Sequence, residues 1–97
     1  MPQYVALLTW TDQGIKNAKE TIQRAEQVNQ LLQQMGGRMT TMLWTIGQYD
    51  AISITEAPDD ETAIAMALAV ASQGNVRLET LKGFTAEEMA GILRKLG

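Results

Sequence analysis

The apolar residues of this 97-residue chain change their spacing along the sequence, and each spacing predicts a different element. Residues 3–11 form a short run rich in aromatic and β-branched side chains, which predicts a first strand. From Gln13 to Met35, apolar residues recur every three or four positions, as on one face of an amphipathic helix. Two glycines at 36–37 can end that helix, so we expect a strand followed by one long helix.

Two more strands are expected over residues 38–46 and 49–57, separated only by the dipeptide Gly-Gln at 47–48. A two-residue loop that begins with glycine fits a type II′ hairpin turn, in which the first loop residue has a positive φ. This turn predicts a register in which Trp44 faces Ala51, and a shift of one residue would reverse both faces.

The second half of the chain predicts another helix, strand and helix. Residues 59–61 are all acidic and open an alanine-rich helix to about Gln73, because negative charge is favourable at a helix N-terminus. A fourth strand is expected over residues 75–82. Thr85 and Glu88 have the spacing of a capping box, in which each side chain accepts from the other's backbone N–H. They begin a last helix with an apolar stripe formed by Met89, Ile92, Leu93 and Leu96.

The order of these elements predicts the fold class. A βαββαβ order matches the ferredoxin-like motif, an α+β fold with a four-stranded antiparallel sheet. The last helix is an addition to that motif at the C-terminus. The length suits one domain that spans residues 1–97, and there is no linker or repeat in the sequence.

The sheet looks apolar on both faces, although an antiparallel sheet that is wet on one side alternates apolar and polar residues. One face of the hairpin would carry Met42, Trp44, Ile46, Tyr49 and Ala51, and the other Leu43, Ile52 and Ile54. The motif places helices on one face only, and large exposed apolar patches are uncommon in monomers. We therefore expect a homodimer or larger homo-oligomer, with an interface formed by Met42, Trp44, Ile46 and Tyr49. The alternative is that the C-terminal helix folds across the second face.

Charge and missing residue types exclude several classes of function. Eight Lys and Arg are scattered among 11 Asp and Glu, for a net charge of -3, so there is no basic stripe for nucleic acid. The chain has no histidine and no cysteine, which removes disulfides, thiolate chemistry and the commonest metal ligands. We expect no metal, no cofactor and no membrane partner, since no apolar run is long enough to cross a bilayer. The cytoplasm is the location expected by default.

Several short motifs resemble those of one family. The letters G-Q-Y-D at 47–50, followed by E-A-P-D-D at 56–60, are similar to the GYD domain family. So are T-D-Q-G at 11–14, G-N-V-R-L-E-T-L at 74–81 and F-T-A-E-E at 84–88. The resemblance covers nearly the whole chain. It implies a small prokaryotic protein of the dimeric α/β-barrel type, without an established activity.

Four polar residues are candidates for ligand binding. Tyr49 and Asp50 follow the tight turn, where the tyrosine could donate a proton and the carboxylate could act as a base or bind a ligand. Arg77 and Glu79 lie two apart on one strand and share a face, so Arg77 could bind a carboxylate or phosphate. The structural alternative is that Asp50 accepts backbone hydrogen bonds, Tyr49 packs at an interface, and Arg77 forms an ion pair within or between subunits.

Two tryptophans and an acidic run complete the candidates. Trp10 and Trp44 could stack on a flat ligand, although a strand tryptophan is more often part of a core or an interface. The acidic residues 59–61 could suggest a hard metal, but three consecutive acids do not converge on one point. The sequence favours a non-catalytic homo-oligomeric domain that could bind a small ligand between sheet and helices or between subunits. The alternative is a cofactor-independent enzyme, resembling the monooxygenases and isomerases of the dimeric α/β-barrel type, acting on a small organic substrate.

Overall fold

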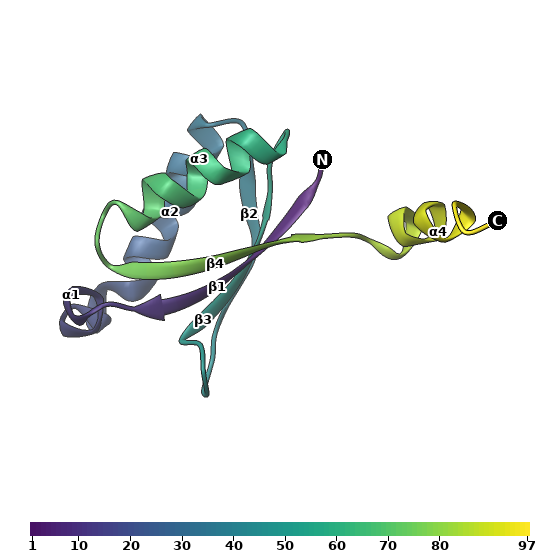
Figure 1. Ribbon diagram of the computed structural model, residues 1–97. Helices are drawn as coiled ribbons and strands as arrows, with labels where there is room; N and C mark the ends of the chain where they lie inside the picture. The colour runs from purple at the N-terminus through teal and green to yellow at the C-terminus, as the bar shows by residue number, and fades with distance from the viewer.

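The structure is a computed structural model that describes residues 1–97 (Figure 1). In chain order the elements are β1 (Gln3–Trp10), α1 (Asp12–Lys16), a 3-10 helix (Ala18–Glu20), α2 (Thr21–Gln34), β2 (Arg38–Trp44), β3 (Ala51–Glu56), α3 (Asp60–Ala71), β4 (Val76–Gly83) and α4 (Ala86–Arg94). The strands form one antiparallel sheet in the order β2–β3–β1–β4. This confirms the α+β class, the ferredoxin-like βαββαβ order and the extra C-terminal helix.

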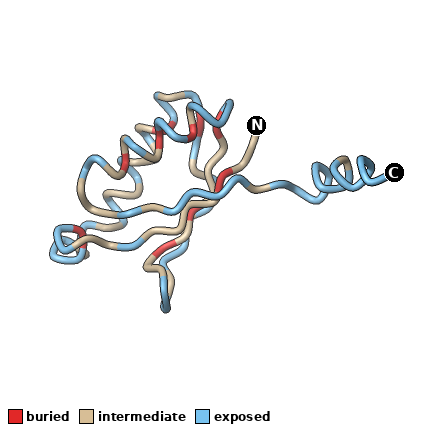
Figure 2. Tube along the Cα trace, viewed as in Figure 1, coloured by how far each residue is buried: buried red, intermediate tan, exposed pale blue.

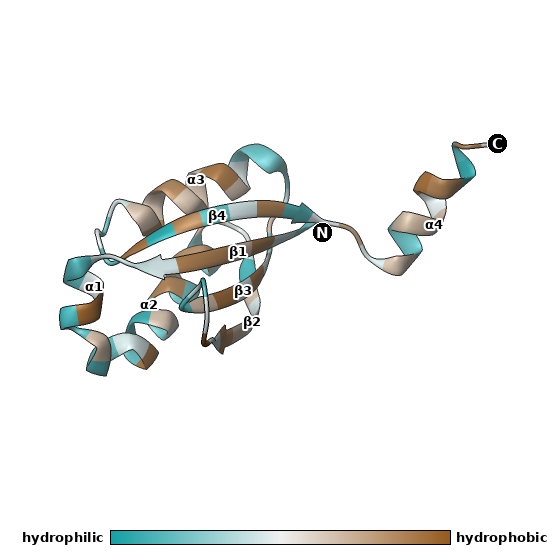
Figure 3. Ribbon diagram, turned by 60° about the horizontal axis from the view of Figure 1, so that its bottom comes forward, coloured by the Kyte–Doolittle hydropathy of each residue, from teal (hydrophilic) through white to brown (hydrophobic).

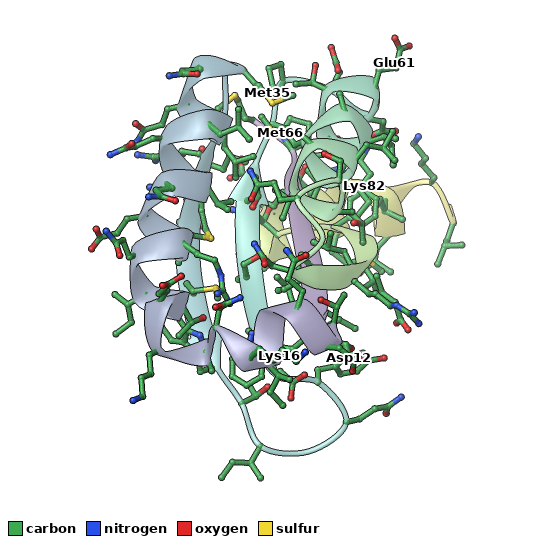
Figure 4. All side chains as sticks on the ribbon, turned by 90° about the vertical axis from the view of Figure 1, so that its left-hand side faces the viewer. Asp12, Lys16, Met35, Glu61, Met66 and Lys82 are labelled. Atoms are coloured by element: carbon green, nitrogen blue, oxygen red, sulfur yellow. The ribbon has the colours of Figure 1, made fainter.

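Helices α2 and α3 lie side by side over one face of the sheet, and no helix lies over the other face (Figures 1 and 4). Met35 at the end of α2 and Met66 of α3 point toward each other between the two helices (Figure 4). The strands run beneath them with β1 in the centre, paired with β3 on one side and with β4 on the other. The sheet therefore has one covered face and one open face.

The single helix expected over residues 13–35 is divided into α1, the 3-10 helix and α2. Gly14 lies within α1 where the backbone approaches Asn75 closely, because a Cβ on Gly14 would lie 1.9 Å from the carbonyl oxygen of Asn75. The first helix ends with Asn17 as its C-cap. The guanidinium of Arg24 donates to the carbonyl oxygens of Asn17 at 2.7 Å and Gly14 at 3.3 Å, which also accept from backbone N–H groups. These bonds join the start of α2 to the end of α1.

The hairpin between β2 and β3 has the predicted register and a longer loop. Trp44 pairs with Ala51, as the sequence predicts. The strands end earlier than expected, so residues 45–50 form the connection in place of a two-residue turn. The carboxylate of Asp50 accepts a hydrogen bond from the backbone N–H of Trp10 at 2.8 Å. This bond ties the loop to β1.

The core lies between the covered face and the two helices, and it is thin. Only 10 of the 97 residues are buried, and no large side chain is completely enclosed (Figure 2). The central cluster consists of Tyr4, Leu32, Ala57, Ala63 and Met66, with Val28, Met35 and Met39 packed against it. A core of this size leaves much of the chain's apolar surface outside it.

Helix α4 lies apart from the rest of the molecule, beyond the end of β4 (Figure 1). Its N-terminus has the predicted capping box, with Thr85 and Glu88 each accepting from the other's backbone N–H. It packs against no other helix or strand of the chain. The C-terminal helix therefore does not cover the open face, which was the alternative to self-association.

Candidate functional site

The open face of the sheet is an apolar surface of the strands that no helix covers. Side chains alternate across a strand, and those that do not face the helices lie on this side. Along the sheet they include Val5, Leu7, Leu43, Ile52, Ile54 and Leu81. Val5 pairs directly with Ile54, and Leu7 with Ile52, so the apolar side chains form a continuous row across the two central strands.

The covered face holds a cavity of about 110 Å³ between the sheet and helices α2 and α3. Most of the residues that line it are apolar, and the strands contribute small ones, including Ala6, Ala51 and Ser53. Small side chains under two helices leave space that a closer packing would fill. The cavity therefore follows from the residues that the strands present on this side.

Both tryptophans line this cavity, at the end where β1 and β2 finish. The indole N–H of Trp44 donates to the hydroxyl of Thr21 at 3.0 Å, which joins β2 to the start of α2. Trp44 is partly exposed, and its ring forms part of the wall on this side. Trp10 and Trp44 thus share one cavity, as a site for a flat ligand would require.

The polar candidates lie elsewhere, on the open side of the sheet. The hydroxyl of Tyr49 donates to the carboxylate of Glu79 at 2.9 Å. This bond raises the pKa of Tyr49 above its ordinary value, because the neighbouring carboxylate favours the protonated phenol. Arg77 is exposed and has no ion pair within the chain. The carboxylate of Asp50 is engaged by the backbone of β1.

The six candidate ligand-binding residues therefore do not converge on one point. Trp10 and Trp44 line the cavity, while Tyr49 and Glu79 are joined on the opposite side of the sheet. Arg77 is exposed on that same side of the edge strand β4, without an ion pair. A tyrosine whose pKa is raised holds its proton more firmly, which makes it a poor proton donor. The geometry gives this set no shared substrate position.

The residues expected at an oligomer interface are also divided. Met42 and Trp44 face the helices and line the cavity. Ile46 is fully exposed at the tip of the 45–50 loop, and Tyr49 reaches the open side. The open face is built instead mainly by the two central strands. The sequence showed two apolar faces, but its periodicity could not say which of them the helices cover.

A second hydrogen-bonded group lies at the other end of the covered face. The hydroxyl of Tyr4 donates to Asp60 at 2.5 Å, and the ammonium of Lys82 lies 2.9 Å from the same carboxylate oxygen. The carboxylate raises the pKa of Tyr4 to about 12. The hydrogen bond from Tyr4, followed by that from Lys82, lowers the pKa of Asp60. These bonds tie β1 and β4 to the start of α3, so the group is structural.

Two further findings bear on the kind of site. No group of three or more His, Cys, Asp or Glu side chains is arranged to hold a metal ion. No helix is both long enough and apolar enough to cross a membrane.

Comparison with known proteins identifies the family. The family model described as the GYD domain matches residues 4–93, which is almost the whole chain. The chain belongs to the GYD domain family. A Thermus thermophilus protein named glutamine synthetase and cystathionine beta-lyase binding protein is 30% identical over 95 residues, which cover 97% of this chain and 100% of that protein.

A solved structure supports the fold of this GYD domain. The crystal structure of a protein from Thermus thermophilus matches with a TM-score of 0.58, over 89% of this chain and 96% of the other. The two sequences are 18% identical, so the likeness concerns the fold alone.

Two of the GYD-like motifs meet in space. The backbone N–H of Thr11 donates to the carbonyl of Asn75 at 3.1 Å, and its hydroxyl donates to the carbonyl of Gly74. The side-chain amide of Gln13 donates to Gln73 and to Asn75, at 3.1 and 2.9 Å. Residues 11–14 and 73–75 thus form one hydrogen-bonded junction. These motif residues hold the fold together where the cavity ends, which their sequence separation alone did not reveal.

Proposed function

We propose that this GYD domain is a non-catalytic protein-binding module that pairs with a second copy of itself through the open face of the sheet. The observation that carries the proposal is the row of large apolar side chains across β1 and β3 that no helix covers. Burying apolar area contributes roughly 25 cal/mol per Å², which makes a wet face of this kind unfavourable. When two such faces pack together, each shields the other from water. A two-fold arrangement of this kind is complete with two copies.

The relative from Thermus supports the protein-binding part of this proposal. Its name describes a protein that binds two enzymes, and it matches this chain along the full length of both. The polar candidate residues also favour protein binding over catalysis. They are hydrogen-bonded to one another or to backbone and surround no substrate position. We infer that the domain acts by binding enzymes of this kind rather than by catalysis.

The pairing is tested by Leu7→Lys, which places a charge in the middle of the open face. We expect it to halve the mass measured by light scattering, because burying an ammonium is costly even beside Glu79, whose carboxylate already accepts from Tyr49. Gln3→Lys is the matched control, on the same strand and the same side but at the sheet's end beside Glu56. An unchanged mass for Leu7→Lys would contradict pairing through this face.

Binding to other proteins is tested separately. The chain is immobilised, and glutamine synthetase and cystathionine β-lyase from its own organism are passed over it in a surface plasmon resonance measurement. We expect saturable binding of at least one enzyme and none of an unrelated acidic protein. If neither enzyme binds, the protein-binding proposal is wrong, whatever the state of self-association.

The cavity supports a second candidate function, the binding of a small apolar ligand. At about 110 Å³ it is somewhat smaller than the roughly 150 Å³ apolar cavity that takes up benzene or xenon in another protein. Trp10 and Trp44 in its wall report on occupancy through their fluorescence. We expect benzene or indole to change this fluorescence saturably, and Ser53→Val, which occupies part of the space, to abolish the change. A linear, non-saturating change would exclude the cavity as a binding site.

A further inference from the structure

Helix α4 carries an apolar stripe that nothing in its own chain covers. Met89, Ile92 and Leu93 lie on one side of the helix at intervals of three and four residues, and Leu96, just beyond the C-cap Lys95, is 82% exposed. The helix has nine residues, while isolated helices shorter than about 12–15 residues are marginal in water. An ordered α4 therefore requires a surface to pack against.

Helix α3 offers a matching apolar surface on its outer side. Its inner side buries Ala63, Met66 and Val70 against the sheet, yet Ile64 and Leu68 on the outside are 53% and 65% exposed. Figure 3 shows that apolar residues occupy most of its length. A helix that is apolar all round is normally buried all round. Helix α3 thus lacks a partner as clearly as α4 does.

The charges at the helix ends select the orientation in which these surfaces fit. Helix α3 begins with the acidic residues 59–61 and carries no basic residue. Helix α4 begins with Glu87 and Glu88 and finishes with Arg94 and Lys95. An antiparallel pair sets the basic end of α4 beside the acidic end of α3, whereas a parallel pair sets acid beside acid.

The chain's own α4 cannot reach this antiparallel position. The end of β4 lies at the start of α3, where Lys82 meets Asp60. Only Phe84 and Thr85 separate β4 from α4, and two residues span at most about 7 Å. The far end of the 12-residue α3 is about 18 Å away. A folded-back α4 would therefore run parallel to α3, in the unfavourable orientation.

We propose that α4 of one copy packs antiparallel against the outer face of α3 of a second copy, and that the exchange is mutual. The contact joins the stripe of α4 to Ile64 and Leu68, with Arg94 of one chain near Glu61 of the other. Glu61 points away from the body of the molecule, free to meet it (Figure 4). Both copies give one helix and receive one, so the contact closes with two-fold symmetry. It uses neither face of the sheet and is compatible with pairing through the open face.

Disulfide trapping tests the exchange directly, because the chain has no cysteine of its own. In the antiparallel pair that sets Arg94 near Glu61, Leu68 lies near Met89, and in the parallel fold-back it lies near Leu93. Single variants Leu68→Cys and Met89→Cys are mixed and oxidised, and intact mass is measured. We expect a covalent heterodimer in high yield, with Leu68→Cys and Leu93→Cys as the matched control mixture giving little. Rapid intramolecular closure of the double variant Leu68→Cys/Leu93→Cys would instead establish the fold-back and overturn the proposal.

A charge exchange gives a second test, because substitutions of exposed charged residues should leave each chain folded. Arg94→Glu and Glu61→Arg should each weaken the α4-dependent association severalfold, and the double variant should restore it. If the double variant is weaker than either single one, the predicted orientation is wrong. Leu93→Asp separates this contact from pairing through the sheet. It should halve the native mass of the Gln3→Lys control protein, and it should reduce the Leu7→Lys protein to a monomer. A Leu7→Lys protein that is already monomeric would refute the exchange and leave the sheet pairing standing.

Discussion

The two faces of the sheet are both apolar, but only one of them is covered. On the covered side the central strands mix large residues such as Trp10 with small ones such as Ala6 and Ser53, which leave a cavity beneath the helices. On the open side the same strands present Val5, Leu7, Ile52 and Ile54, which no helix covers. A row of large apolar side chains on an uncovered face is the arrangement expected when that face packs against another protein surface.

The largest effect that distinguishes the faces should come from Met66→Ala. Met66 is buried in the central cluster on the covered side, so its truncation should lower the free energy of unfolding by about 2–5 kcal/mol. Ile52→Ala is the control on the open side. In urea denaturation at low protein concentration it should cost less, and its cost should grow with concentration as copies associate. If Ile52→Ala lowers the free energy of unfolding more than Met66→Ala does in dilute protein, the contrast between a covered and an open face is wrong.

Filling the cavity should raise the free energy of unfolding, whereas truncation of Met66 should lower it. Ser53 is buried beside it, and Ser53→Val adds apolar volume on a central strand where β-branched residues are favoured. We expect a gain of about 0.5–2 kcal/mol in the free energy of unfolding. Thr41→Val, on the open side of β2, is the control and should change little at low concentration. Destabilisation by Ser53→Val would mean that the hydroxyl, rather than the space, is what the covered face needs.

Helix α4 belongs to neither face, and its stability should be separable from that of the body. Thr85→Ala removes the hydroxyl that accepts from the backbone N–H of Glu88, at a cost of about 1 kcal/mol to the helix. Hydrogen exchange should show faster exchange at the amides of residues 86–94 and no change in β1 or β3. If protection falls equally in the strands, α4 and the sheet unfold as one unit.

The smallest effect concerns pH and the Tyr4–Asp60 hydrogen bond. The pKa of Tyr4 is raised to about 12 in the folded chain, from an ordinary value of 10, so folding favours the protonated phenol. This contribution to stability is complete below pH 10 and is lost as the pH rises toward 12. Denaturation curves from about pH 9 to 12 should therefore fall more steeply for the natural chain than for Tyr4→Phe. Tyr49→Phe is the control and should remove a smaller part of the slope.

Much of the fold was readable from the sequence because its signals are local. The capping box at Thr85, the acidic start of α3 and the pairing of Trp44 with Ala51 each depend on residues a few positions apart, and all are present. The open question was which apolar face the helices cover. Period-2 patterns are the same for either choice, so Met42 and Trp44 were expected at an interface and instead face the cavity.

The elements that differ from expectation depend on contacts distant in sequence. Helix α1 packs closely against Asn75 at Gly14, and the hairpin loop is tied to β1 by Asp50. No local pattern reports either contact. The sequence could not show which candidate site residues lie together, for the same reason. Spacing along a strand shows which residues share a side, but not which of them meet across the sheet.

The central position of β1 has a consequence for the time course of folding. Residues 3–10 are synthesised before their partners, which are residues 51–56 and 76–83, and the junction of residues 11–14 needs residues 73–75. Pairings this far apart must close long loops before they gain any stability, which slows folding. Strand β1 therefore precedes both of its partners on the ribosome, and its apolar side chains stay unprotected until residues 76–83 have been made.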